Sequence, residues 1–299
     1  MDRFNALQTF ITIAEQGSFA GAARSLGQSP PAVTRAISAL ENQLGTRLFL
    51  RTTRSVRLTE SGERFMIDSK RILADLAEAE QAAIGTHAEP RGNLKITAPV
   101  LFGRLYVTPI LGDYLDSFGE ITAETLFVDR VVNLMDEGLD VAIRIGELPD
   151  SGLTAIRTGK VRRVVVASPS YLARFGRPER PKDLSAHEII AATATGSVTN
   201  WQFFEDESPF SIAISPRLKM NTNDAAIEMI SRGHGVSRLL SYQVAPLITQ
   251  GILEPVLENY EPPPLPIHVV HQEGRLVSSR VRSFVDFMVE RLRANADIN

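Results

Sequence analysis

GSFAGAARSLGQSPPAVTRAISALENQL, residues 17–44, is the stretch of sequence that decides how the N-terminal region folds. Ser18 is suited to cap a short helix, because its hydroxyl can accept an otherwise unpaired backbone N–H of the first turn. Gly27 marks a tight turn, and Ser29 can cap a further helix that begins with two prolines, where missing N–H groups cost little. Two helices joined by a tight glycine turn predict a helix-turn-helix.

A preceding helix and a shared apolar core complete this small domain. Residues 4–16 carry apolar side chains at helical spacing, and the helix after Ser29 carries its own apolar stripe as far as Leu44. The side chains expected to face inward are those of Phe4, Leu7, Phe10, Ile11, Ala14, Ala32, Val33, Ala36, Ile37, Leu40 and Leu44.

The outward face of the helix after Ser29 is the expected DNA-reading surface. A helix lying in a major groove presents its N-terminal residues to base edges. Arg35 has donors for guanine or phosphate, and Thr34 can contact a phosphate or a thymine methyl group. The candidate DNA-binding residues of this helix are Ser29, Pro30, Pro31, Thr34, Arg35 and Ser38.

A two-stranded wing is predicted immediately downstream. Apolar residues 48–50 and the segment 55–58 flank the basic tip 51–54, so Arg51, Thr52 and Arg54 would lie over phosphates or enter the minor groove. The alternative is an ordinary three-helix domain with a solvated hairpin.

The distribution of charge supports nucleic-acid binding by the N-terminal region alone. Residues 1–60 hold seven Arg, no Lys and four acidic residues, a balance of +3, whereas the whole chain carries −3. The remaining residues therefore carry −6, and a basic head on an acidic body is expected where only the head meets a phosphate backbone.

Length and composition indicate a cytoplasmic protein of about two domains. The chain has 299 residues, 43% of them hydrophobic and 22% charged, which are ordinary values for a globular protein. No apolar run is long enough for a membrane helix, and the first residues do not look like a secretory signal. The absence of Cys excludes disulfides and thiol chemistry and fits a reducing compartment.

Together these strings resemble the DNA-binding domain of LysR-type transcriptional regulators. The resemblance covers about residues 4–62, through GSF-x-x-AA-x-x-L, S-x-P-A-V-T-R and LG-x-RLF-x-RT-x-R-x-x-x-LT-x-x-G. Pro30 departs from the family, in which many members carry a base-reading Gln at this position. The resemblance implies a homo-oligomer, usually a dimer of dimers, that binds double-stranded promoter DNA, responds to a small-molecule effector and can contact RNA polymerase.

Residues 61–92 are predicted to form a linker helix and a hinge. Phe65, Ile72 and Ala79 recur every seven residues, as do Leu76 and Ala83 at an offset of four, which favours pairing with a second copy. The alternative is an amphipathic helix packed on its own body. Pro90 and Gly92 mark the end of this segment, and residues 1–60 form the DNA-binding domain before it.

Residues 93–299 alternate between strand and helix patterns, which indicates α/β layers. We expect a strand at 94–98, a helix at 101–118 with a kink at Pro109, a strand at 121–128, a helix at 131–137 and a strand at 140–145. The family implies a two-lobed α/β effector domain resembling type 2 periplasmic binding proteins. Its lobes would be about 93–161 with 267–299, and 162–266.

Ligands of open α/β sheets bind beyond the carboxyl ends of strands. The segment after Ala98 follows a strand and begins a helix, whose free N–H groups favour a carboxylate. Arg144 lies near the end of another strand, where it would face either the cleft or a structural partner. The candidate effector residues, carried over by motif position, are Pro99, Val100, Leu101, Arg144, Gly146, Thr193, Thr195 and Asn223.

No catalytic, metal or cofactor motif is found, so no catalytic residue, metal site or cofactor is expected. The prediction is a DNA-binding regulator, not an enzyme, controlled by a small carboxylate. Two alternatives remain: an enzyme with an attached DNA-binding head, which would turn over its ligand, and an architectural DNA-binding protein without an effector.

Overall fold

The computed structural model describes residues 2–51, 56–83, 89–149, 152–193, 199–272 and 278–298. Its contacts divide the chain into two compact units, Met1–Ala88 and Glu89–Asn299. None of the helices in these ranges is long and apolar enough to cross a membrane.

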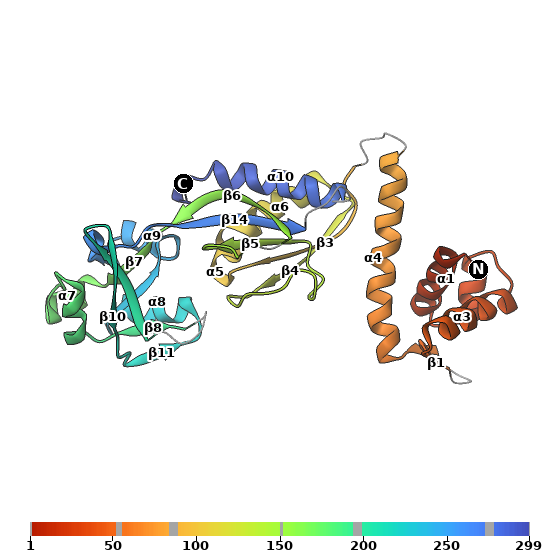
Figure 1. Ribbon diagram of the computed structural model, residues 1–299, viewed down its shortest axis with the longest axis horizontal. Helices are drawn as coiled ribbons and strands as arrows, with labels where there is room; N and C mark the ends of the chain where they lie inside the picture. The colour runs from red at the N-terminus through yellow and green to blue at the C-terminus, as the bar shows by residue number, and fades with distance from the viewer. Residues whose placement is uncertain are drawn as a thin grey trace. The chain divides into compact units, whose positions relative to one another are not determined.

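The N-terminal unit is a winged helix-turn-helix followed by a long helix (Figure 1). Its elements are α1 (Arg3–Gln16), α2 (Phe19–Ser25), α3 (Pro30–Leu44), β1 (Phe49–Arg51), β2 (Val56–Leu58) and α4 (Glu60–Ala83). Strands β1 and β2 pair antiparallel, as predicted for the wing.

Local signals set the helix boundaries. Ser18 caps α2 by accepting the N–H of Gly21 at 3.2 Å, and Gly27 adopts a φ of +62° in the turn before α3. The helices enclose one apolar core that includes Phe10, Ile13, Val33, Ile37 and Leu40. Phe4 in the first turn of α1, expected to face this core, is instead 45% exposed and does not belong to the core cluster.

A buried carboxylate joins the recognition helix to the wing. Glu41 on α3 is only 4% exposed, and its Oε1 accepts the backbone N–H groups of Leu48 at 2.8 Å and Phe49 at 3.2 Å. Gly62 on α4 leaves room for the same segment, since a Cβ there would lie 2.2 Å from the carbonyl oxygen of Leu48. These contacts fix the direction in which the wing leaves α3.

Helix α4 contributes to the core at its start and leaves apolar side chains uncovered further along. Phe65 packs against Phe10 with ring centroids 5.3 Å apart. Ile67 and Ile72 are 61% and 40% exposed within this unit. The predicted seam residues Ala79 and Ala83 lie where the structure describes the helical backbone but not the side chains.

The larger unit contains a five-stranded mixed sheet with strand order β4-β3-β5-β14-β6. Its strands are β3 (Gly92–Ala98), β4 (Ile121–Phe127), β5 (Val141–Ile145), β6 (Leu153–Val161) and β14 (Leu265–Gln272). Helix α6 (Thr108–Ser117) and the C-terminal α10 (Ser279–Arg293) contribute to the core on one face of this sheet (Figure 1). A separate cluster around Val132, Leu134 and Val270 lies on the other face.

The rest of this unit, residues 162–264, builds smaller sheets. The strands are β7 (Arg163–Ala167), β8 (Ile190–Ala192), β9 (Asn200–Glu205), β10 (Ser208–Ala213), β11 (Leu218–Met220), β12 (Val236–Leu240) and β13 (Glu254–Val256). Strand β7 is central in the sheet β12-β7-β13. The helices are α7 (Pro169–Phe175), α8 (Asn223–Ser231) and α9 (Ser241–Thr249).

Two expected helices in the larger unit differ from the structure. The predicted helix at 131–137 is wrong, because this segment forms only a turn over 134–138. Asn133 Oδ1 accepts the N–H of Met135 at 3.0 Å, a local bond that competes with helix formation. The predicted helix at 101–118 is present as α5 (Val100–Phe102), a π-helical stretch Gly103–Val107 and α6, with Pro109 in the first turn of α6.

The chain crosses twice between the two sheet systems. Arg162 alone separates β6 from β7, and residues 257–264 lead back from β13 to β14. Arg162 Nη1 binds Glu261 Oε2 of the second crossing at 2.8 Å. Tyr242 of α9 is 1% exposed and packs into the core of the five-stranded sheet, where it meets Phe102 with ring centroids 5.3 Å apart.

Candidate DNA-binding face and effector cavity

The N-terminal part of α3 presents the predicted DNA-binding residues on one exposed face. Pro30, Pro31, Thr34 and Arg35 are exposed, and Ser38 is half-buried, while Val33 and Ile37 face the core. The Thr34 hydroxyl donates to the carbonyl of Pro30 at 2.9 Å, which leaves the oxygen free to accept. Ser29 is the N-cap residue of α3 but forms no side-chain capping bond, so the predicted cap is wrong; the prolines of the first turn have no N–H to offer it.

The wing extends this face only in part. Arg51 ends β1, but its side chain is not described, and Thr52 and Arg54 lie outside the described residues. Arg57 on β2, which the sequence did not single out, is exposed and pairs with Leu50 of β1.

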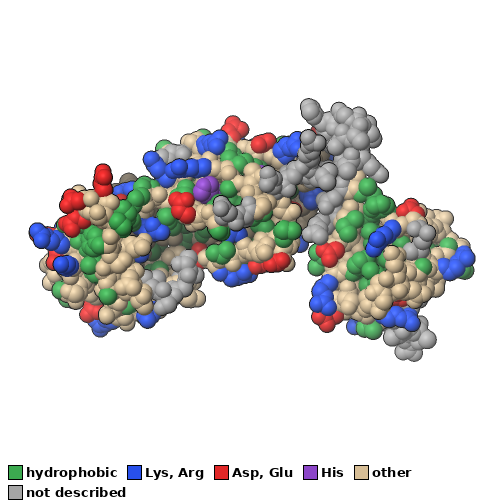
Figure 2. Space-filling view, viewed as in Figure 1, with side chains coloured by type: hydrophobic (Ala, Val, Ile, Leu, Met, Phe, Trp, Pro, Cys, Tyr) green, Lys and Arg blue, Asp and Glu red, His purple; other side chains and the backbone are tan. Residues whose placement is uncertain are grey.

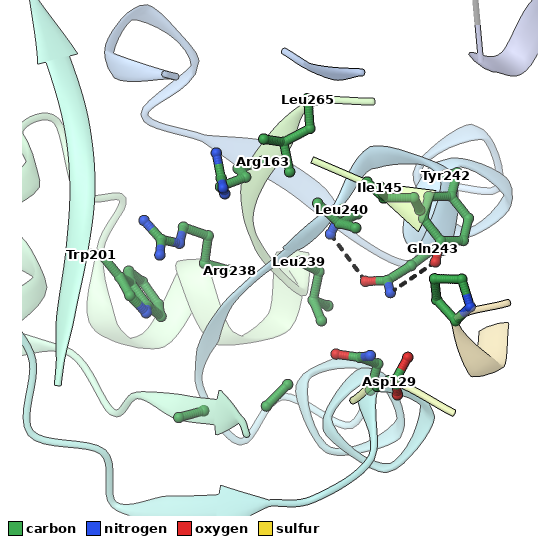
Figure 3. A pocket seen from close by; sticks show the side chains of 14 residues that line it. Asp129, Ile145, Arg163, Trp201, Arg238, Leu239, Leu240, Tyr242, Gln243 and Leu265 are labelled. Atoms are coloured by element: carbon green, nitrogen blue, oxygen red, sulfur yellow. Dashed lines mark hydrogen bonds between the residues drawn. The ribbon is translucent and has the colours of Figure 1, made fainter. Parts of the chain in front are cut away.

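A cavity of about 310 Å³ lies within the larger unit, between the carboxyl ends of β3 and β4 and the sheet of β7 and β12 (Figure 3). The surface of this unit is visibly hollowed between its two sheet systems (Figure 2). The lining residues are Pro99, Asp129, Ile145, Arg163, Ala191, Ala192, Trp201, Asn223, Arg238, Leu239, Leu240, Tyr242, Gln243 and Leu265.

Two arginines share one side of the cavity because of strand register. Arg163 on β7 pairs with Leu240 on β12, and Arg238 lies two residues before Leu240, so both side chains project from the same face. Figure 3 shows their guanidinium groups next to each other. Arg238 donates to the carbonyl of Gln202 at 3.0 Å and lies 5.3 Å from the ring centroid of Trp201.

Burial makes this pair electrostatically costly. Desolvation, together with the neighbouring positive charge of Arg163, lowers the pKa of Arg238 to about 10. Desolvation also lowers the pKa of Arg163. Within the described parts of the chain, neither guanidinium forms a salt bridge with a carboxylate. An anion that accepts hydrogen bonds from both would reverse this cost.

The helix start after β3 is occupied by a carboxylate of the protein itself. Asp129, directly after β4, accepts the N–H of Val100 through Oδ1 at 3.1 Å. The predicted carboxylate site at this helix start therefore already has an anion. Pro99 and Asn223 line the cavity, whereas Leu101 is buried in the core.

The candidates Arg144, Gly146 and Thr193 lie outside the cavity lining. Arg144 donates to the carbonyl of Val132 and so secures the turn segment against β5. Gly146 donates its N–H to Pro266 at 2.9 Å, and Thr193 binds the carbonyl of Met220 through its hydroxyl at 3.1 Å. Thr195 is outside the described residues.

A winged helix-turn-helix on one unit and a charged cavity in a separate α/β unit define a DNA-binding regulator with a ligand-binding domain. Residues 4–63 match the family model of the bacterial regulatory helix-turn-helix protein, lysR family. Residues 87–293 match that of the LysR substrate binding domain. The chain belongs to the LysR family of transcriptional regulators, as the resemblance predicted.

Individual relatives are similar in sequence to this chain over nearly its full length. The chain is 36% identical to an HTH-type transcriptional regulator of Xanthomonas campestris, over 96% of this chain and 85% of the relative. It is 32% identical to the regulator CrgA of Neisseria meningitidis over 97% of both chains. The solved structure of CrgA, a LysR-type transcriptional regulator, covers 97% of this chain and 99% of its own, with 31% identity and a TM-score of 0.62.

Proposed function

We propose that a small anion bound in the effector cavity controls how this regulator binds its operator DNA. The observation that carries the proposal is the pair Arg163 and Arg238, two half-buried cations side by side without a carboxylate partner in the described chain. Such a pair is stable when an anion accepts hydrogen bonds from both groups. These residues take the anion-binding role that the sequence suggested for Arg144.

Trp201 provides a direct assay of this proposal. It is the only tryptophan of the chain, and its ring lines the cavity against Arg238. Small carboxylates would be titrated into wild type, Arg163→Gln and Arg238→Gln while the fluorescence of Trp201 is followed, with exposed Arg282→Gln as the control.

Loss of one charged donor costs about 1.5–3 kcal/mol, which corresponds to roughly a ten- to hundredfold rise in Kd. We expect this loss in both cavity variants and none in the control. Equal binding by all four proteins would remove the arginine pair from the site. No response to any small anion would favour the alternative, a regulator without a small-molecule effector.

Sequence-specific recognition is proposed for the exposed face of α3, with Arg35 as the main base-reading side chain. The face is exposed, lies at the N-terminal end of the helix and carries Arg35 beside Thr34. In this proposal the protein acts in the cytoplasm, where its DNA lies, and has no catalytic activity of its own. RNA polymerase is the further partner proposed for the DNA-bound state.

Pairing of two copies through α4 is proposed to align two recognition helices, and two such dimers to form a tetramer. The uncovered apolar side chains of Ile67 and Ile72 support this role. Ile72→Asp should lower the assembly mass measured by native mass spectrometry, while exposed Glu63→Gln on the same helix should not. An unchanged mass for Ile72→Asp would exclude α4 pairing.

A further inference from the structure

We infer that the effector is amphoteric, with an anionic group held by Arg163 and Arg238 and a hydrogen-bond-donating group, most simply an ammonium, held by Asp129. This inference rests on the proposed function and adds the chemistry of the opposite end of the same cavity. It follows from the position of Asp129, the one carboxylate among the described residues that line the cavity.

The cavity is polarised from end to end. Arg163 and Arg238 project from the sheet of β7 and β12, and Figure 3 shows Asp129 well away from both guanidinium groups, on the other side of the cavity. Asp129 accepts one backbone N–H, from Val100, and within the described chain it forms no salt bridge with a basic side chain. One end of the cavity therefore offers donors and the other end offers acceptors.

The acidic end favours a positively charged or donating group. Burial raises the pKa of Asp129, and the nearby carboxylate of Asp224 raises it further, while the bond from Val100 opposes both effects. The charge of Asp224 is held by hydrogen bonds from Thr222 and from the backbone N–H of Ala225. A bound ammonium would favour the ionised form of Asp129 and reduce the repulsion between the two carboxylates.

The middle and the net charge of the cavity narrow the ligand class. Ile145, Leu239 and Leu265 also line the cavity, and Figure 3 shows Leu239 between Arg238 and Asp129, so a short hydrocarbon segment fits between the two polar groups. A volume of about 310 Å³ suits a small metabolite. Two guanidinium groups and one carboxylate sum to +1, which a dicarboxylate with one amino group would neutralise.

The test compares compounds that differ only in the amino group. L-glutamate and glutarate, L-aspartate and succinate, and L-phenylalanine and 3-phenylpropanoate would each be titrated into the full-length protein, with Trp201 fluorescence as the readout. The wild type would be compared with Asp129→Asn and with the control Asp116→Asn, an exposed carboxylate on α6.

We expect the amino member of at least one pair to bind about tenfold more tightly, the effect of one added charged hydrogen bond. Asp129→Asn should reduce that preference to within about threefold, whereas Asp116→Asn should retain it. The wild-type comparison needs no variant, so it remains decisive if Asp129→Asn folds poorly.

Three results would overturn the inference: equal binding within every pair, an amino preference that persists in Asp129→Asn, or no response to any of the six compounds. Equal binding that still depends on Arg163 and Arg238 would leave an anion-controlled regulator intact. Binding that is independent of both arginines would contradict the proposed function as well, so the two failures are distinguishable.

Discussion

Replacing Glu41 by alanine should loosen the wing while leaving the three helices folded. The carboxylate accepts the backbone N–H groups of Leu48 and Phe49, two residues that are only 1% and 3% exposed. An unsatisfied buried N–H costs about 1–3 kcal/mol, so losing the shared acceptor should cost about 2–6 kcal/mol in total. The ion pair with Arg47 adds little, because Arg47 is 77% exposed and 3.8 Å away.

Hydrogen exchange of the full-length chain measures this effect at the amides concerned. A cost of about 2 kcal/mol corresponds to roughly thirtyfold faster exchange in peptides covering residues 45–51. Glu41→Gln keeps an oxygen acceptor and should show a smaller change. Glu15→Ala removes an exposed carboxylate paired with Lys70 and should leave the peptide unaffected. Unchanged protection of these peptides in Glu41→Ala would refute the assigned role of Glu41.

Three further predictions concern the two units separately. Gly103→Ala should lower the melting temperature followed by Trp201 fluorescence, because its Cβ would lie 2.5 Å from the ring of Phe127. Gly112→Ala places its Cβ in open space and should leave the melting temperature unchanged. Equal melting temperatures of the two variants would contradict this prediction. Burial lowers the pKa of His268 below its ordinary value of 6.5, so the unfolded chain binds the proton first and stability falls as the pH drops below about 6.5. His268→Gln should therefore flatten the decline in melting temperature between about pH 7 and pH 5, and an unchanged decline would exclude this contribution. Arg35→Ala should weaken operator binding by about 1–3 kcal/mol in a fluorescence anisotropy titration, and an equal loss on random DNA would identify a phosphate contact instead.

The winged helix-turn-helix was predictable because its determinants are local. Ser18, Gly27 and the apolar stripe of α3 lie within a few turns of one another, and each signals its conformation without reference to distant residues. Glu41 was missed because a charged residue in a helix is ordinarily solvated. Only the folded structure shows that the chain returns to α3 at Leu48, where the Glu41 carboxylate accepts a backbone N–H that has no other partner among the described residues of the wing.

The position of the cavity could be predicted from the sequence, but most of the residues that line it could not. Pro99 follows a strand, so its place at a carboxyl end was predictable. Arg163 and Arg238 are brought together by the register of β7 against β12, which no local pattern reveals. The sequence predicted that the helix start after Ala98 would bind a carboxylate of the ligand. Its Val100 N–H is instead bound by the carboxylate of Asp129, which lies two residues after the end of the neighbouring strand β4.

The burial of Tyr242 limits how this regulator can respond to a ligand. The residue belongs to α9, yet its ring packs among Phe102 and Tyr106 in the core of the other sheet, beside the cavity. Parting the two sheets would expose that ring to water at a cost of about 1.5–3 kcal/mol. A large opening and closing motion of the two sheets is therefore disfavoured. A ligand that contacts Tyr242 would act instead through small rotations of one sheet relative to the other.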